Sequence, residues 1–347
     1  MAKKNTGTGA GLTQLKADLK AHSPGKCYVL YGEEDYLRRY YFEQLKKQLL
    51  DPATEAFNFH RLTSETFTLP SFTQSLEALP MMSERSLVSV EDVDIFSLRE
   101  DERTELAAQL CDLPDYACLV LSYTDFKPDR RQKKLWEALE KNAVLAEFVY
   151  QSEDDLRAWV ARHFRAEGKY AAPELCSYLI QRCGTSMTRL DAEMQKVCAY
   201  AADRELTRAD LDAVTEPTLE ASVFEMTDAI ADRAFDRALE RLNTILLLHA
   251  EPIPVLAAIG MQMRRLYAAR VLLSEGKDAD ALASVCSMPP FAARMTMKQA
   301  RRLSDRFCRR AVLLCCDTDY RMKTSYDEPE DLLQTLLFSL TEEARND

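Results

Sequence analysis

Several chemical signatures are missing from this sequence of 347 residues. Its ten cysteines include no Cys-x-x-Cys pair, which argues against a zinc ribbon or a thioredoxin-like redox site. Its four histidines have no paired spacing, and neither a Gly-x-Ser-x-Gly nor a His-Glu-x-x-His motif occurs, so nucleophilic or zinc-dependent hydrolysis has no support. No apolar run approaches the roughly 18 residues of a membrane span. We therefore expect a soluble, cytoplasmic protein without a metal site.

The chain also lacks an excess of basic residues. Lys and Arg number 45 against 56 Asp and Glu, which gives a net charge of −11. A nucleic acid is therefore not held through net charge, and contact with DNA requires a local basic surface or companion subunits. The most basic stretch, Lys298 to Arg310, suits a phosphate backbone, a solvated face or an acidic neighbour equally well.

The hydrophobic content of 47% is enough for two or three domains with buried cores. After a mobile leader expected over residues 1 to about 10, the first half has strand-like runs over 27–31, 57–60, 86–90, 117–122 and 144–148. Helical spacing covers 35–50, 70–79, 99–110 and 129–140. Strands separated by helix-length crossovers predict a parallel sheet covered on both faces. From residue 152 onward nearly every segment has the helical period, which predicts a small helical domain to about residue 215 and then a larger one.

The first predicted strand leads into the turn where a nucleotide-binding fold carries its phosphate loop. Binding phosphates there requires several glycines, a lysine and a hydroxyl group for Mg²⁺. This sequence has one glycine, Gly32, followed by three acids at 33–35, and no Gly-Lys-Ser/Thr. Three carboxylates suit a helix N-terminus through the helix dipole, but they repel a triphosphate. We interpret the acidic turn as a helix cap and expect nucleotide-binding architecture without its chemistry, and hence no cofactor.

Four stretches resemble the delta subunit family of the bacterial DNA polymerase III clamp loader, a group of catalytically inactive relatives of AAA+ ATPases. The stretches are YVLYGEEDYL at 28–37, LPMMSERSLV at 79–88, VFEMTDAI at 223–230 and MQMRRL at 261–266. The resemblance spans about residues 26 to 340. It implies an α/β fold followed by an all-α part: a RecA-like parallel sheet domain with a degenerate phosphate loop over 1–148, a helical lid domain over 149–215 and a helical collar domain over 216–347.

The resemblance also implies a function and a set of partners. The chain is expected to be a non-catalytic subunit that binds the β sliding clamp and opens the ring or holds it open. Partner subunits of the gamma/tau and delta-prime type then load the ring on primed DNA, driven by ATP. Two alternatives stay open: a delta-prime-like or motor subunit, which the missing phosphate loop, Ser-Arg-Cys trio and zinc-binding cysteines disfavour, and an enzyme with an unrecognised nucleotide site.

In this family, exposed apolar side chains at the end of a helix in the first domain grip the clamp. The matching positions here are Leu79, Pro80, Met81 and Met82. Pro80 interrupts the preceding helix at Leu79, and flexible, polarizable methionines can adapt to an apolar pocket of a partner. From the residues alone, Leu79 also fits the buried stripe of that helix, and both methionines also fit the core.

A second site implied by the resemblance is a DNA contact at Lys323 and Tyr326. The segment 320–326 lies in the collar region that approaches the primer-template junction in the family. An aromatic side chain at Tyr326 can stack on a base, which is worth about 1 to 3 kcal/mol. Packing in the core or between helices is an equally good interpretation, because Asp327 and Glu328 next to Tyr326 repel phosphate.

Overall fold

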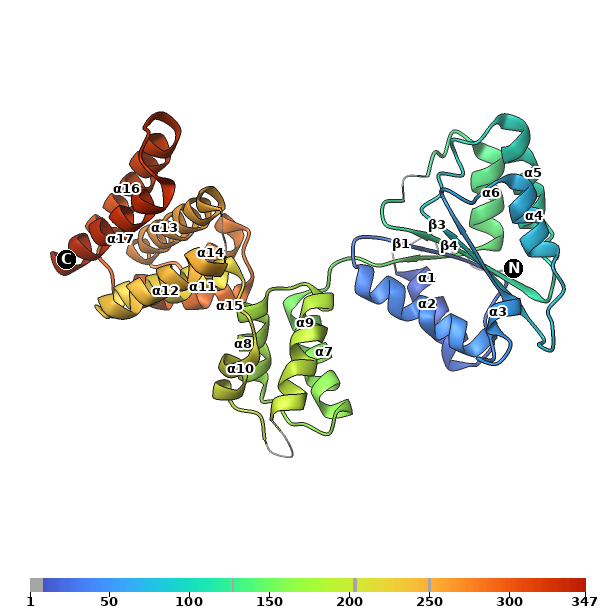
Figure 1. Ribbon diagram of the computed structural model, residues 1–347, viewed down its shortest axis with the longest axis horizontal. Coiled ribbons are helices and arrows are strands. Elements are labelled where there is room, and N and C mark those ends of the chain that lie inside the picture. Colours follow the sequence, from blue (N-terminus) through green and yellow to red (C-terminus); the bar gives the residue numbers. More distant parts are fainter. Residues whose placement is uncertain (1–8, 127, 202–204, 249–250) are drawn as a thin grey trace. The chain divides into compact units, whose positions relative to one another are not determined.

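The computed structural model describes residues 9–126, 128–201, 205–248 and 251–347, and the chain divides into two compact units, 1–151 and 152–347 (Figure 1). Most of the leader expected over residues 1 to about 10 lies outside the described residues. Helix α1 (Ala10–Lys20) begins at the end of that stretch.

The first unit is built on a five-stranded parallel sheet with the order β2-β3-β4-β1-β5. The strands are β1 (Cys27–Tyr31), β2 (Phe59–Thr63), β3 (Ser86–Glu91), β4 (Ala117–Tyr123) and β5 (Val144–Glu147). The helices that follow α1 are α2 (Asp35–Leu49), α3 (Glu55–Asn58), α4 (Leu69–Glu77), α5 (Glu100–Cys111) and α6 (Lys133–Asn142). The predicted parallel α/β fold is confirmed.

Successive strand residues point to opposite faces of the sheet, and helices cover both faces. Val29 and Leu119 join one buried cluster with Phe72 of α4, Leu106 of α5 and Leu139 of α6. Tyr28, Leu30 and Val120 join the other cluster with Leu15 of α1 and Leu45 of α2. Burial on both faces explains why the inner strands β1 and β4 are nearly continuous apolar runs, whereas the edge strand β2 is not.

Three predicted boundaries in this unit are wrong. The helix expected over 70–79 ends at Glu77, and Ala78 is already extended. The run 57–60 is not a strand throughout, because Phe57 and Asn58 belong to helix α3. The Phe57 N–H donates to the Thr54 carbonyl at 3.0 Å, and the Asn58 side chain donates to the same carbonyl at 3.2 Å, which closes a helical turn before β2. The helix expected from residue 129 begins at Lys133, because the Asp129 carboxylate accepts from the N–H of Arg131 at 3.0 Å and forms a turn there.

The described residues of the second unit form helices and no strand, as the periodicity predicts. The first four helices are α7 (Glu153–Ala166), α8 (Pro173–Cys183), α9 (Met187–Tyr200) and α10 (Arg208–Val214). The remaining helices are α11 (Leu219–Ala231), α12 (Phe235–Leu248), α13 (Pro252–Ser274), α14 (Ala279–Cys286), α15 (Pro290–Ala300), α16 (Asp305–Thr324) and α17 (Pro329–Arg345). Side chains of α11 to α17 share one continuous apolar core.

Most of the cysteines are small core residues. All ten are free thiols, and six of them are buried. Burial raises the pKa of the Cys118 thiol in β4 to about 12, so this side chain stays a neutral, unreactive thiol at physiological pH.

Candidate functional sites

The turn between β1 and α2 is closed by the protein's own groups. Gly32 has φ of 123°, and a Cβ atom at that position would lie 2.2 Å from the carbonyl oxygen of Phe148. The same carbonyl accepts from the N–H of Glu34 at 3.0 Å, and the Glu34 carboxylate accepts from the N–H of Tyr36 at 3.3 Å. Glu34 is only 4% exposed, and burial raises the pKa of its carboxyl. The backbone N–H groups of Glu34 and Tyr36, which a phosphate loop would offer to its ligand, are therefore already used.

An ion pair covers the neighbouring edge of the sheet. Asp35 pairs with Arg38 and with the Nε atom of Arg39, the latter at 2.7 Å. Arg38 also donates to the Ser122 hydroxyl in β4 at 2.7 Å. The carboxyl ends of parallel strands are where nucleotides bind in such folds, and here these side chains are engaged with one another. The interpretation of the acidic turn as a helix cap is confirmed.

The loop between α4 and β3 presents apolar side chains to solvent. Leu79 is 74% exposed, Met81 54% and Met82 92%, whereas Pro80 is partly buried. Helix α4 ends at Glu77, and Ala78 has an extended conformation, so Leu79 does not continue the buried stripe of Phe72 and Leu76. The alternatives that placed Leu79 and both methionines in the core are wrong. We call residues 78–85 the apolar loop.

The apolar loop is tethered at its start, middle and end. The Tyr116 hydroxyl donates to the Glu77 carbonyl at 3.2 Å. In the middle, the Met81 N–H donates to Asn58 Oδ1 at 2.7 Å, and Asn58 Nδ2 donates to the Met81 carbonyl at 3.0 Å. At the end, the Arg85 guanidinium donates to the carbonyls of residues 24, 25 and 117 at 2.6, 2.9 and 3.3 Å. The exposed side chains therefore stand on a fixed backbone.

The backbone of the apolar loop also contains a costly conformation. Met82 has φ of 52°, in the left-handed region that non-glycine residues avoid. Such conformations persist where the surrounding structure enforces them, and they concentrate at functional sites. Sequence reasoning identified the methionines but not Asn58 and Arg85, whose roles depend on partners distant in the chain.

The segment matched to the DNA contact lies at the C-terminal end of α16. Tyr326 is fully exposed just beyond the helix, so the alternative of core packing is wrong for it. Lys323 pairs with Asp319 at 2.7 Å. Asp327 accepts from Arg321 at 3.1 Å, and this hydrogen bond lowers the pKa of the Asp327 carboxyl. The Asp327 carboxylate beside Tyr326 therefore stays ionised, and the Arg321 guanidinium partly balances its charge. The apolar loop belongs to the first unit and this segment to the second.

The basic stretch from Lys298 to Arg310 is not one helix, because it spans the end of α15 and the start of α16. Arg302 pairs with Asp228 of α11 and with Asp232, the C-cap residue of that helix, and Arg310 pairs with Glu343 of α17 at 3.1 Å. At least these two guanidinium groups are engaged in joining helices of the second unit.

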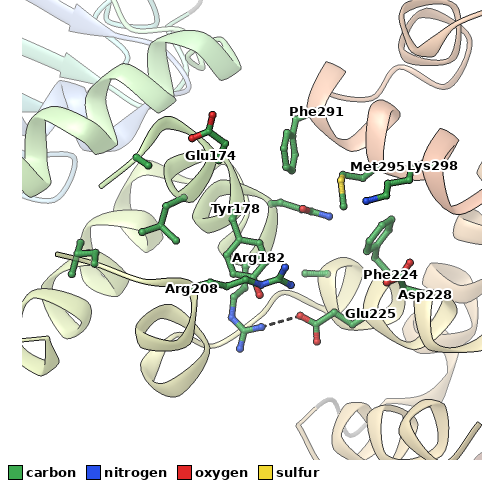
Figure 2. Close-up of a pocket in the computed structure, with 15 residues that line it drawn as sticks. Glu174, Tyr178, Arg182, Arg208, Phe224, Glu225, Asp228, Phe291, Met295 and Lys298 are labelled. Atoms are coloured by element: carbon green, nitrogen blue, oxygen red, sulfur yellow. Dashed lines mark hydrogen bonds and ion pairs between the residues drawn. The ribbon is translucent and has the colours of Figure 1, made fainter. Parts of the chain in front are cut away.

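A cavity of about 560 Å³ lies within the second unit, between α8 and α10 on one side and α11 and α15 on the other (Figure 2). Its lining combines Tyr178, Phe224, Phe291 and Met295 with three basic and three acidic side chains. Buried Arg182 of α8 donates to the Thr215 hydroxyl at 2.8 Å and to Glu225 of α11 at 2.9 Å. The ion pair with Glu225 links the two sides of the cavity. The three basic and three acidic side chains balance in charge, and Arg182 and Glu225 pair with each other. Its polar contacts connect the two groups of helices.

Within the described part of the chain, no three His, Cys, Asp or Glu side chains are arranged to hold a metal ion. Among these same residues, no helix has both the length and the apolar character that crossing a membrane requires.

The fold and these sites define a class of chain: an α/β domain of nucleotide-binding architecture whose phosphate turn is closed, continued by a helical unit. Residues 28–149 match the family DNA polymerase III, delta subunit, and residues 220–340 match the C-terminal domain of that subunit. The chain is 27% identical to DNA polymerase III subunit delta of Bacillus subtilis over 330 residues, or 93% of this chain and 94% of that relative. It is 21% identical to the probable DNA polymerase III subunit delta of Aquifex aeolicus, over 73% of each chain.

A solved structure agrees with these relatives. The Bacillus subtilis DNA clamp loader delta protein is 26% identical, and the match covers 95% of this chain and 99% of that one with a TM-score of 0.58. The chain therefore belongs to the DNA polymerase III delta subunit family, and it is a component of the clamp loader in DNA replication. The resemblance inferred from the four sequence stretches is confirmed.

Proposed function

We propose that the apolar loop binds the β sliding clamp through Leu79, Pro80, Met81 and Met82. The observation that carries this proposal is the exposure of three large apolar side chains on a loop whose backbone is tethered at its start, middle and end. Transfer of exposed apolar side chains from water into an apolar pocket of a partner is favourable. Methionine in addition adapts its shape to such a pocket. A preformed loop also loses little conformational entropy on binding.

We also propose that the chain has no catalytic activity of its own and binds no cofactor. In support of this, Glu34 caps helix α2 and Asp35 pairs with Arg38 and Arg39, so both carboxylates are engaged within the chain. ATP hydrolysis then belongs to partner subunits of the gamma/tau and delta-prime type. The chain contributes by differential binding: it opens the clamp or holds it open only to the extent that it binds the open ring more tightly than the closed one.

The proposed division of the helical unit is a lid over 149–215 and a collar over 216–347, the latter assembling with other loader subunits in the cytoplasm. We assign the primer-template contact to Lys323 and Tyr326. The support for this assignment is the full exposure of the Tyr326 ring beside a carboxylate whose charge Arg321 partly balances. Base stacking on an exposed aromatic ring does not depend on sequence, as loading at any primed site requires.

A pull-down of the purified sliding clamp by the isolated chain, without nucleotide, tests the proposed function. We expect capture of the clamp, and loss of capture when Met81 and Met82 are both replaced by alanine. A parallel titration with a fluorescent ATP analogue is expected to show no saturable binding. A chain that binds the analogue but not the clamp would overturn the proposal.

A further inference from the structure

Asn58 is a fully buried polar side chain that serves the apolar loop. Its Oδ1 atom accepts from the Met81 N–H at 2.7 Å, and its Nδ2 group donates to the Met81 carbonyl at 3.0 Å and to the Thr54 carbonyl at 3.2 Å. Both hydrogens of the amide are therefore used. One side chain satisfies both polar backbone groups of a residue 23 positions further along the chain.

The sheet topology explains why these two segments meet. Asn58 directly precedes β2, and the apolar loop directly precedes β3. The strands β2 and β3 are parallel neighbours, with Phe59 paired to Leu87, so their N-terminal ends lie at the same edge of the sheet. The side-chain amide of Asn58, the last residue before β2, therefore lies beside the apolar loop that leads into β3.

We propose that Asn58 is a positioning residue for clamp binding, an inference that rests on the proposed function of the apolar loop. Asn58 is inaccessible and cannot touch a partner, so it acts through Met81. It holds the backbone of Met81, next to Met82 in its left-handed conformation, in the shape that presents the apolar side chains. Without the amide, the loop has to become ordered when it binds, and the lost entropy weakens the complex.

A double-mutant cycle on the full chain tests this role. Clamp affinity is measured by calorimetry for the wild type, for Asn58→Ala, for Met81→Ala/Met82→Ala and for the triple variant. We expect Asn58→Ala to weaken binding about tenfold in the wild-type background and less than about twofold when both methionines are absent, because contacting residues are energetically coupled. An equal loss in the two backgrounds, or no loss in the first, would overturn the role of Asn58.

A matched control separates positioning from general stability. Leu110→Ala removes a buried side chain from α5 in the same unit. It is expected to lower the melting temperature at least as much as Asn58→Ala while leaving clamp affinity within about twofold, because Leu110 provides none of the hydrogen bonds that tether the apolar loop. Weakened clamp binding by Leu110→Ala would show that loss of stability alone accounts for the effect of Asn58→Ala.

A measurement on the wild-type chain does not depend on the folding of any variant. The Met81 amide hydrogen is bonded to Asn58, so we expect it to exchange with solvent at least about 100-fold more slowly than an unprotected amide, although it lies in an exposed loop. Rapid exchange would refute the inference about Asn58. Slow exchange together with unchanged clamp affinity of the Met81→Ala/Met82→Ala variant would instead refute the proposed function of the loop.

Discussion

Replacing Met81 and Met82 by alanine removes the two most adaptable side chains of the apolar loop. They are 54% and 92% exposed, so most of their surface is available to a partner. Complete burial of one methionine side chain is worth about 1.5 to 3 kcal/mol. Scaled by the exposed fractions, a partner that covers both side chains gains about 2 to 4 kcal/mol from them, which corresponds to about 30-fold to 1,000-fold in Kd.

The same substitutions should leave the fold nearly unchanged. Exposed side chains contribute little to the free energy of unfolding, so we expect a change within about 0.5 kcal/mol, or about 1 to 2 °C in melting temperature. The assay is calorimetric titration with the sliding clamp, with thermal unfolding measured on the same samples. Leu247→Ala in α12 is the matched control, because Leu247 is equally apolar and exposed but lies in the other unit. Clamp affinity of the Met81→Ala/Met82→Ala variant within twofold of the wild type would refute this account.

Four further predictions concern the tethers, the collar and the thiols. Arg85→Met leaves three backbone carbonyls without their donor, so the free energy of unfolding in urea should fall by about 1 to 3 kcal/mol; an unchanged midpoint would contradict this. In a reconstituted loader, Tyr326→Ala should weaken primer-template engagement, and unchanged loading rates would remove Tyr326 from the site. A thiol reagent should modify exposed Cys111 and Cys316 first, and modification of Cys118 at the same rate would contradict its burial. Burial raises the pKa of the Cys118 thiol to about 12, whereas an unfolded thiol ionises near pH 8.5. Above about pH 8.5 the unfolded state therefore binds fewer protons than the folded state. The free energy of unfolding should then fall as pH rises from 8 to 10, more steeply than in Cys118→Ala; equal slopes would contradict the shift.

The strands and their parallel arrangement were predictable because burial on both faces leaves a plain signal in the sequence. Residues 117–121, for example, form an uninterrupted apolar run that is buried throughout β4. The family was predictable for a different reason, since four short stretches in a fixed order are specific together although none is specific alone.

The boundaries and the supports of the apolar loop were not predictable because they depend on distant partners. Asn58 has alternating apolar neighbours typical of a strand, yet hydrogen bonds to Thr54 and Met81 place it in a helical turn. Arg85 gives no local signal either, because its partners include carbonyls 60 and 61 residues earlier in the chain. The apolar character of Met82 fits a core and an interface equally well, and only its surroundings in the fold show that it is exposed.

Titration of the isolated chain with the sliding clamp of the same organism, in the presence and absence of Mg²⁺-ATP, tests the function most directly. A non-catalytic clamp-binding subunit predicts saturable binding with the same Kd in both conditions. Because the turn after β1 is closed by Glu34 and Phe148, nucleotide should have no site through which to change the affinity. Absence of binding, or binding that requires ATP, would contradict the account.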